Sequence, residues 1–308
     1  MPDYNKNILA KKLKKINNLT VKTDVTLKKY TSFQVGGPAD IFVVPQTISA
    51  LKNLLEKINF QQTPVFILGK GTNIIAGDRG FKGIIIHTVN LNQIEVHQNT
   101  ITAESGISLS TLAQTALENK LSGLEFASGI PGSLGGALCM NAGAYGQEMK
   151  DIVEEALLFD YSGIKQTVTN QELNFSYRHS LLKEKPLIAV RAKMSLKPAS
   201  SKKIKKLMKK LNQKRKDKQP LEWPSAGSIF KRPPDNYAGS LIEKTGLKGL
   251  KIGGAEVSRK HAGFIINKGE ATASDIKRLV SKVQQEVYEN TGIKLEPEPV
   301  FIGEFSEN

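Results

Sequence analysis

The chain has 308 residues, enough for about two or three domains, and its composition is ordinary for a globular protein. The single cysteine, Cys139, excludes an intramolecular disulfide, and no apolar segment follows the charged start, so a cytoplasmic protein is expected. The formal net charge of +15 favours anionic partners, namely nucleic acid, acidic lipid or phosphorylated small molecules, without choosing among them.

Apolar spacing predicts a β-α-β beginning. Residues 39–45 are a predicted strand, residues 47–60 a helix with apolar side chains on one face, and residues 63–69 a buried strand. A strand over 83–87, short strands around Ile94 and Ile101, and a helix near 108–119 follow. Residues 152–161 and 186–196 are predicted strands that flank a turn at Ser162 and Gly163.

Much of the positive charge lies in residues 202–218, where Ile204, Leu207, Met208 and Leu211 have the spacing of one helical face. The lysines then lie on the other face. One interpretation is a helix that binds nucleic acid or a membrane surface, and the favoured one is a solvated helix that covers a domain seam. No aromatic residue lies among these lysines to stack on bases, so nucleic-acid binding is not expected. Membrane insertion is not expected either.

The rest of the chain has a proline-rich loop, a short predicted helix around Leu241 and a strand over 261–267. A long helix is predicted from Thr272, where Asp275 completes the pattern of a capping box. A last strand is predicted over 300–303. The elements together indicate an α+β fold with a boundary near residue 200.

Two uncharged glycine-rich segments are candidates for a ligand cradle. Residues 128–146 contain six glycines, which permit positive φ or close approach of a ligand to the backbone, and are too interrupted to span a membrane. Gly69 and Gly71 follow a strand and precede Thr72 and Asn73, a pattern typical of a phosphate-binding nest, although a plain β-turn is the alternative. Two such segments could bind one long dinucleotide.

Seven ordered motifs, at 30–40, 68–73, 128–146, 175–183, 224–233, 253–267 and 295–303, give the chain a specific resemblance. Over residues 20–304 it resembles the UDP-N-acetylenolpyruvoylglucosamine reductase family, flavoenzymes of peptidoglycan precursor synthesis. The resemblance implies an α+β fold in which an FAD-binding domain of the vanillyl-alcohol-oxidase type has two subdomains, 1–95 and 96–200, and a UDP-sugar domain covers 201–308. It implies FAD as cofactor and NADPH-dependent reduction of UDP-N-acetylglucosamine enolpyruvate to UDP-N-acetylmuramate.

The resemblance also assigns three catalytic residues. Ser228 matches the proton donor, and Arg178 and Glu298 match the residues that meet the substrate carboxylate. Glu298 is expected to act protonated, because an ionised glutamate would repel that carboxylate. Glu296, two residues earlier, is the alternative acid.

The implied ligand contacts lie mainly in the two glycine-rich segments. FAD would contact the first at Gly69, Lys70, Gly71, Thr72 and Asn73. In the second it would contact Ser128, Gly129, Ile130, Pro131, Gly132, Ser133, Gly136, Asn141, Gly143, Ala144, Tyr145 and Gly146. Substrate contacts are expected at Tyr177, Lys218, Lys231 and Arg232, with Tyr237 as a further candidate. No metal is expected, because the histidines lack the spacing of metal ligands, and His261 is expected to be structural.

The chain departs from some family members at two positions. Only eleven residues separate Arg178 from Val190, which matches a shorter subtype without the inserted loop whose tyrosine covers the substrate. Pro299 stands where valine is common. Two other functions stay open: a flavin oxidoreductase of the same fold with another substrate, and a nucleic-acid-binding module, which would be colourless.

Overall fold

The computed structural model describes residues 5–306, which form two compact units. Unit 1 holds the chain up to Thr23, Ile41–Lys70 and Gly83–Arg215, and unit 2 holds Asp24–Asp40, Gly71–Lys82 and the chain from Lys216. Unit 2 therefore combines the C-terminal part of the chain with two short segments from its first third. The finer division at residues 95 and 200 stays a prediction, and its outermost residues, 1–4 and 307–308, lie outside the described part.

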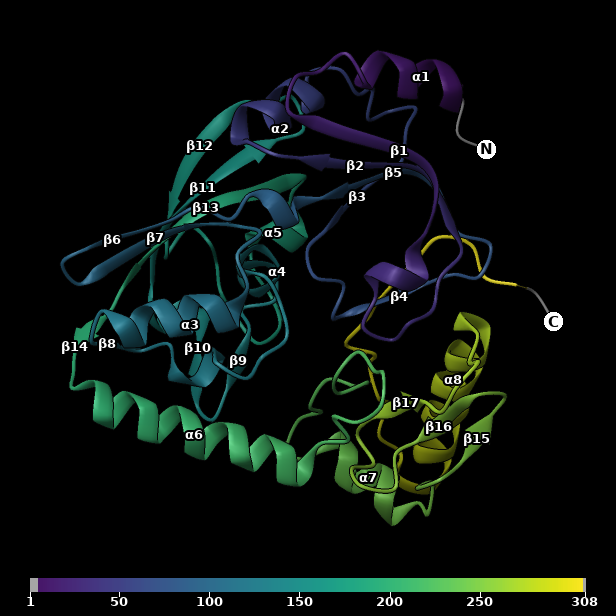
Figure 1. Ribbon diagram of the computed structural model, residues 1–308. Helices are drawn as coiled ribbons and strands as arrows, with labels where there is room; N and C mark the ends of the chain where they lie inside the picture. Colours follow the sequence, from purple (N-terminus) through teal and green to yellow (C-terminus); the bar gives the residue numbers. More distant parts are fainter. Residues whose placement is uncertain (1–4, 307–308) are drawn as a thin grey trace. The chain divides into compact units, whose positions relative to one another are not determined.

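A four-stranded sheet has the strand order β1-β2-β5-β3 (Figure 1). Its strands are β1 (Leu19–Thr26), β2 (Pro38–Pro45), β3 (Val65–Leu68) and β5 (Phe81–His87), and β3 and β5 are parallel. The same part of the chain forms helix α1 (Lys6–Leu13), which precedes β1, and helix α2 (Ile48–Leu55), which lies between β2 and β3 in the sequence. The predicted β-α-β order of β2, α2 and β3 is confirmed, with α2 ending five residues before the predicted end at residue 60.

Unit 1 also contains an antiparallel sheet in the order β12-β11-β13-β7-β6 (Figure 1). Its strands are β6 (Ile94–His97), β7 (Thr100–Glu104), β11 (Val153–Asp160), β12 (Lys165–Thr169) and β13 (Leu187–Ser195). Helices α3 (Leu109–Glu118), α4 (Leu134–Cys139) and α5 (Leu181–Glu184) and the short pairs β8 (Leu121–Ser122) with β14 (Lys197–Pro198) and β9 (Gly143–Ala144) with β10 (Gln147–Glu148) complete the unit.

The prediction that the strands over 152–161 and 186–196 flank the turn at Ser162 and Gly163 was wrong. The turn at Ser162 and Gly163 joins β11 to β12, and β13 comes later in the chain and pairs with the other edge of β11. Four of the five side chains of β12 are exposed, because it is an edge strand with little apolar surface to bury. The strand therefore lacks the apolar pattern by which the others were found.

Helix α6 (Ser201–Lys218) confirms the predicted basic helix. Ile204 and Leu211 are buried and Met208 packs against the core of unit 1, but Leu207 is exposed, so the predicted apolar face is wrong at that position. Within the described residues, no helix is both long and apolar enough to cross a membrane.

Unit 2 has a three-stranded sheet of β15 (Lys251–Ile252), β16 (Ala255–Val257) and β17 (Ile265–Asn267), against which α8 (Ala273–Thr291) packs (Figure 1). Helix α7 (Ala238–Lys244) packs on α8, and β4 (Ile74–Ala76) pairs in parallel with β18 (Val300–Ile302). The predicted helices around Leu241 and from Thr272, and the last strand, are confirmed. The buried residues of α8 recur at helical spacing, which explains why the sequence alone predicted it.

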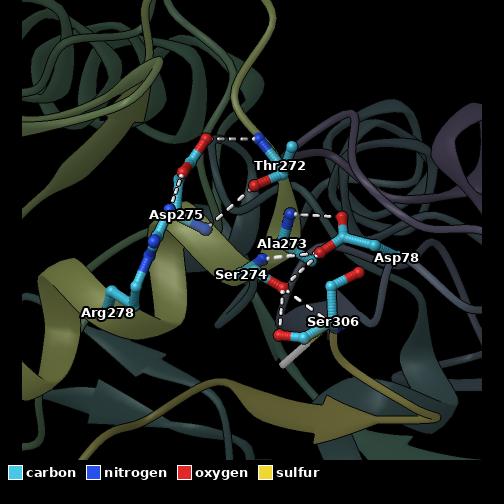
Figure 2. Close-up of polar contacts among 7 residues, drawn as sticks. All are labelled: Asp78, Thr272, Ala273, Ser274, Asp275, Arg278 and Ser306. Carbon is cyan, nitrogen blue, oxygen red and sulfur yellow. Dashed lines mark hydrogen bonds and ion pairs between the residues drawn. The ribbon is translucent and has the colours of Figure 1, made fainter. Parts of the chain in front are cut away.

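An aspartate from a distant loop caps the start of α8 (Figure 2). The predicted capping box is present, because Thr272 and Asp275 each accept the other's backbone N–H. In addition, Asp78 accepts hydrogen bonds from the N–H groups of Ala273, at 2.7 Å, and Ser274, at 2.8 Å, and from the Ser274 hydroxyl. A carboxylate at a helix N-terminus satisfies otherwise unpaired N–H groups and interacts favourably with the helix dipole.

Asp78→Asn is expected to lower the free energy of unfolding of unit 2 by about 2 kcal/mol, because an amide would turn donors toward the donors of Ala273 and Ser274. Asp235→Asn, a change in an exposed loop of the same unit, is the matched control and is expected to be nearly neutral. Urea unfolding followed by fluorescence of Trp223, the single tryptophan, reports on this unit. Equal midpoints for the two variants would contradict the prediction.

Candidate active site

The two glycine-rich segments meet within unit 1. A side chain at Gly69 would overlap the hydroxyl of Ser133, so the start of the first segment lies directly against the second. Ser133 also caps α4 by accepting from the N–H of Gly136, at 3.4 Å. The expectation that segments about 60 residues apart converge is therefore met for the part of the first loop that belongs to unit 1.

Several of these glycines are required by contacts with other parts of the protein. A side chain at Gly129 would overlap Asn212, and one at Gly143 would overlap Glu148. At Gly71, φ is +62° and a side chain would overlap the carbonyl of Tyr30. The glycine density therefore reflects close packing of backbone on protein as well as any approach of a ligand.

The first loop keeps a row of backbone donors unused. Among the residues that the structure describes, the N–H groups of Lys70, Gly71, Thr72 and Asn73 donate to no protein acceptor. Consecutive N–H groups of this kind bind phosphate oxygens. This loop therefore fits the pyrophosphate of the predicted FAD.

His87, the last residue of β5, lies beside this loop. The residue is 9% exposed, and its ring packs against Phe42 with ring centroids 5.4 Å apart and forms a hydrogen bond with the backbone of Gly69. Burial lowers the pKa of His87 from 6.5 to about 4, and the bond to Gly69 opposes this shift only in part. The folded protein therefore holds the histidine neutral.

A pH dependence of stability follows from His87. Since its pKa is lower in the folded state, the unfolded chain takes up a proton first as the pH falls below 6.5, and stability is lost between pH 6.5 and about 4. The loss is expected to be about 1 kcal/mol at pH 5.5 and about 3 kcal/mol near pH 4. Urea unfolding of wild type and His87→Gln at each pH isolates the contribution of His87 to the loss of stability. If the free energy of unfolding depended on pH in the same way in both proteins, the prediction would be refuted.

Arg178 lies in unit 1 at the end of a tight turn. Ser176 and His179 exchange two backbone hydrogen bonds of 3.2 Å each, with Tyr177 and Arg178 between them. The guanidinium carbon of Arg178 is 5.0 Å from the centroid of the Tyr177 ring, within reach of a cation–π contact. His179 Nε2 is 2.6 Å from the carboxylate of Glu184, and this bond holds the pKa of Glu184 below its usual range.

Ser228 and Glu298 come together in unit 2. The N–H of Glu298 donates to the carbonyl of Ile229 at 3.0 Å, and the N–H of Ile229 donates to the carbonyl of Gly263 at 2.8 Å. Segments 228–231, 263–264 and 296–298 thus lie side by side, 32 residues or more apart in the chain. The amide of Asn73 donates to the carbonyl of Glu298, at 3.3 Å, which attaches the end of the first glycine loop to the same place.

Other predicted contacts also have partners within unit 2. Lys231 forms an ion pair with Glu296, the residue named above as the alternative acid. Arg232 lies over the ring of Tyr237, with its guanidinium carbon 4.2 Å from the ring centroid, and Lys218 is exposed at the end of α6. His261 is packed: its Nδ1 accepts the N–H of Gly263 at 3.1 Å, its ring meets Phe264, and burial lowers its pKa.

Two residues of α6 that were not among the predicted contacts face the second glycine segment. Asn212 and Arg215 both adjoin Gly129, and the hydroxyl of Tyr145 donates to the carbonyl of Leu211 at 3.1 Å. Burial lowers the pKa of Arg215. The signal was available, because residues 208, 211, 212 and 215 share one helical face and two of them are polar.

The predicted catalytic residues are therefore distributed between the units, with Arg178 in unit 1 and Ser228 and Glu298 in unit 2. The catalytic assignments stay predictions. Among the residues described, no three His, Cys, Asp or Glu side chains are grouped as metal ligands would be.

Two domain models match the chain. An FAD binding domain matches residues 39–168, and the C-terminal domain of UDP-N-acetylenolpyruvoylglucosamine reductase matches residues 219–302. These matches confirm the predicted α+β fold with an FAD-binding part and a C-terminal domain, and FAD as the cofactor.

Relatives cover almost the whole chain. The UDP-N-acetylenolpyruvoylglucosamine reductase of Caldanaerobacter subterraneus is 49% identical over 96% of this chain and 99% of its own length, and that of Clostridioides difficile is 45% identical over 97% and 99%. The crystal structure of the reductase from Thermus caldophilus superposes with a TM-score of 0.81 at 35% identity, covering 92% of this chain and all of the other. The chain therefore belongs to the UDP-N-acetylenolpyruvoylglucosamine reductase family.

Proposed function

We propose that this protein reduces UDP-N-acetylglucosamine enolpyruvate to UDP-N-acetylmuramate, with NADPH as reductant and FAD as cofactor, in peptidoglycan precursor synthesis. The observation that carries the proposal is the end-to-end match to reductases of this name, at 49% identity over 96% of the chain. The match includes the C-terminal domain as well as the FAD-binding part, which favours this substrate over the alternative of another flavin oxidoreductase. The single cysteine and the nature of the substrate support a cytoplasmic location.

When bound, FAD would supply the redox chemistry that carries a hydride from NADPH to the outer carbon of the enolpyruvyl group. The carbon that bears the carboxylate then needs a proton, and we assign its donation to Ser228. Ser228 is exposed at the surface of unit 2, while the two residues that follow it, Ile229 and Phe230, are buried and fix its backbone. A serine is a weak acid in water, so its alkoxide must be stabilised or reprotonated by the site.

Arg178 and Glu298 are assigned to the substrate carboxylate. Negative charge moves onto this group as the enolic intermediate forms, and a fixed cation or hydrogen-bond donor placed there stabilises the transition state more than the ground state. A protonated Glu298 could donate such a hydrogen bond, whereas an ionised one would repel the carboxylate. Its backbone N–H bond to Ile229 places it on the segment next to Ser228, which supports a shared role.

The diphosphate of the substrate is assigned to Lys218, Lys231 and Arg232, with Tyr177 close to Arg178. Charge-assisted hydrogen bonds would provide most of this recognition. Lys231 would have to exchange its ion pair with Glu296 for the phosphate. The lysines of α6 give no reason to expect nucleic acid as a partner, because no aromatic residue accompanies them.

The test is a steady-state assay of the purified holoenzyme. NADPH consumption is measured with and without UDP-N-acetylglucosamine enolpyruvate, and the product is identified by its gain of two hydrogen atoms in a mass spectrum. A yellow protein that forms this product supports the proposal. A yellow protein that oxidises NADPH but leaves this substrate unchanged would favour the alternative flavin oxidoreductase, and a colourless protein that binds polyanions would refute both.

A further inference from the structure

The turn that carries Arg178 is anchored to the end of the helix that begins in the second glycine segment. Helix α4 starts after Ser133 and ends at Cys139. The side-chain amide of Asn141 donates to the carbonyl of Ser176 at 3.1 Å, and the hydroxyl of Ser180 donates to the carbonyl of Cys139 at 2.9 Å. One anchor therefore lies on each side of Arg178, and both belong to unit 1.

The side chain of Asn141, the first of the two anchors, forms three hydrogen bonds. It is 1% exposed, and its amide nitrogen also donates to the Glu148 carboxylate at 2.7 Å, while its oxygen accepts the N–H of Lys150 at 3.0 Å. Both amide protons and one oxygen lone pair are therefore used by protein partners. An asparagine engaged in this way holds three chain segments together and has little left to offer a cofactor.

The backbone of Arg178 needs such support. Its φ is +56°, in the left-handed region that costs a residue with a Cβ about 1 kcal/mol or more. The two bonds inside the turn are 3.2 Å long, and the carbonyl of Ser176 accepts both the N–H of His179 and the amide of Asn141. The bond from Asn141 thus acts on the same carbonyl that closes the turn.

We propose that Asn141 is a positioning residue, whose amide holds the 176–179 turn so that Arg178 keeps a fixed distance from the glycine-rich segment. The inference rests on the proposed function, in which that segment binds FAD and Arg178 meets the substrate carboxylate. A displacement of about 1 Å at such a site can cost about 100-fold in rate. Asn141 therefore acts on substrate reduction through Arg178.

The test uses Asn141→Asp, which keeps the shape of the side chain, tolerates the positive φ of 41° at this position and still accepts from Lys150. Its second oxygen would face the Ser176 carbonyl and the Glu148 carboxylate, both acceptors, so the anchor is lost. Asn170→Asp is the matched control, because Asn170 donates to the carbonyls of Lys150 and Val153 but does not contact the turn.

In stopped-flow measurements on the holoenzyme, Asn141→Asp is expected to slow reoxidation by the enolpyruvyl substrate about 10- to 100-fold. FAD content and the rate of flavin reduction by NADPH are expected to change less than about twofold, as in Asn170→Asp. Adding Asn141→Asp to Arg178→Asn is expected to cause no further loss, because the effect of Asn141 passes through Arg178. Loss of FAD in Asn141→Asp, or an undiminished effect in the double variant, would overturn the proposal.

Hydrogen exchange gives a readout that does not depend on activity. The backbone amides of residues 175–181 are expected to exchange faster in Asn141→Asp than in wild type or Asn170→Asp, and unchanged exchange would overturn the proposal. If the wild-type protein does not reduce the substrate at all, the proposed function fails. The exchange experiment then still decides whether Asn141 holds the turn.

Discussion

Ser228→Ala is expected to lower the rate of reduction of the enolpyruvyl substrate by about 10³-fold while leaving the reduction of FAD by NADPH unchanged. The reason is that alanine removes the assigned proton donor without disturbing the backbone that holds it. Ile229 and Phe230 are almost fully buried, and the N–H of Ile229 keeps its bond to Gly263. Stopped-flow absorbance of the flavin separates the two half-reactions, so the loss can be assigned to one of them.

Ser225→Ala is the matched control for this experiment. Ser225 lies three residues earlier in the same loop. Its carbonyl accepts a hydrogen bond from the hydroxyl of Ser32 at 2.6 Å, and the variant keeps this bond. We expect its turnover to stay within about threefold of wild type. Full turnover in Ser228→Ala, or an equal loss in both variants, would exclude Ser228 as the donor.

Arg178→Asn is expected to lower kcat for substrate reduction by about 10²- to 10³-fold, because the site loses the cation assigned to the developing charge. Asparagine is chosen because it tolerates the left-handed backbone at this position, so the turn itself is not strained further. Arg178→Lys keeps the charge but loses the planar pair of donors, and an intermediate rate is expected.

The effects of the substitution on kcat and on KM distinguish two roles of Arg178. A residue that stabilises the transition state lowers kcat and kcat/KM together, whereas one that only binds substrate raises KM. Reduction of FAD by NADPH is the internal control and should be unaffected. A change confined to KM would assign Arg178 to binding alone.

Local patterns predicted those elements whose side chains are divided into a buried and an exposed face. Helix α8 and its capping box are an example, since Thr272 and Asp275 lie three residues apart and the buried positions recur at helical spacing. The edge strand β12 shows the limit, because an edge strand with mostly exposed side chains has no such contrast. Leu207 shows it too, since its spacing fits an apolar face from which the fold excludes it.

The candidate site divides in the same way. The motifs identified the candidate residues. They also predicted that the two glycine segments approach each other, as they do at Gly69 and Ser133. The role of Asn141 could not be predicted, because its partners at Ser176 and Glu148 are set by the folding of separate segments. An amide in a glycine-rich run is equally suited to a cofactor and to a neighbouring carbonyl, and only the neighbours decide between them.

The sequence by itself determined the family, the cofactor and the identity of the residues assigned to catalysis, because these depend on side-chain chemistry and on the order of motifs along the chain. The tertiary structure alone decided that segments 24–40 and 71–82 fold with the C-terminal part, that Asp78 caps a helix beginning at residue 273, and that Glu298 lies beside Ile229. The physical reason is that these contacts join residues about 70 to 200 positions apart. They result from complementary packing and hydrogen bonding in the complete fold, and local periodicity carries no record of them.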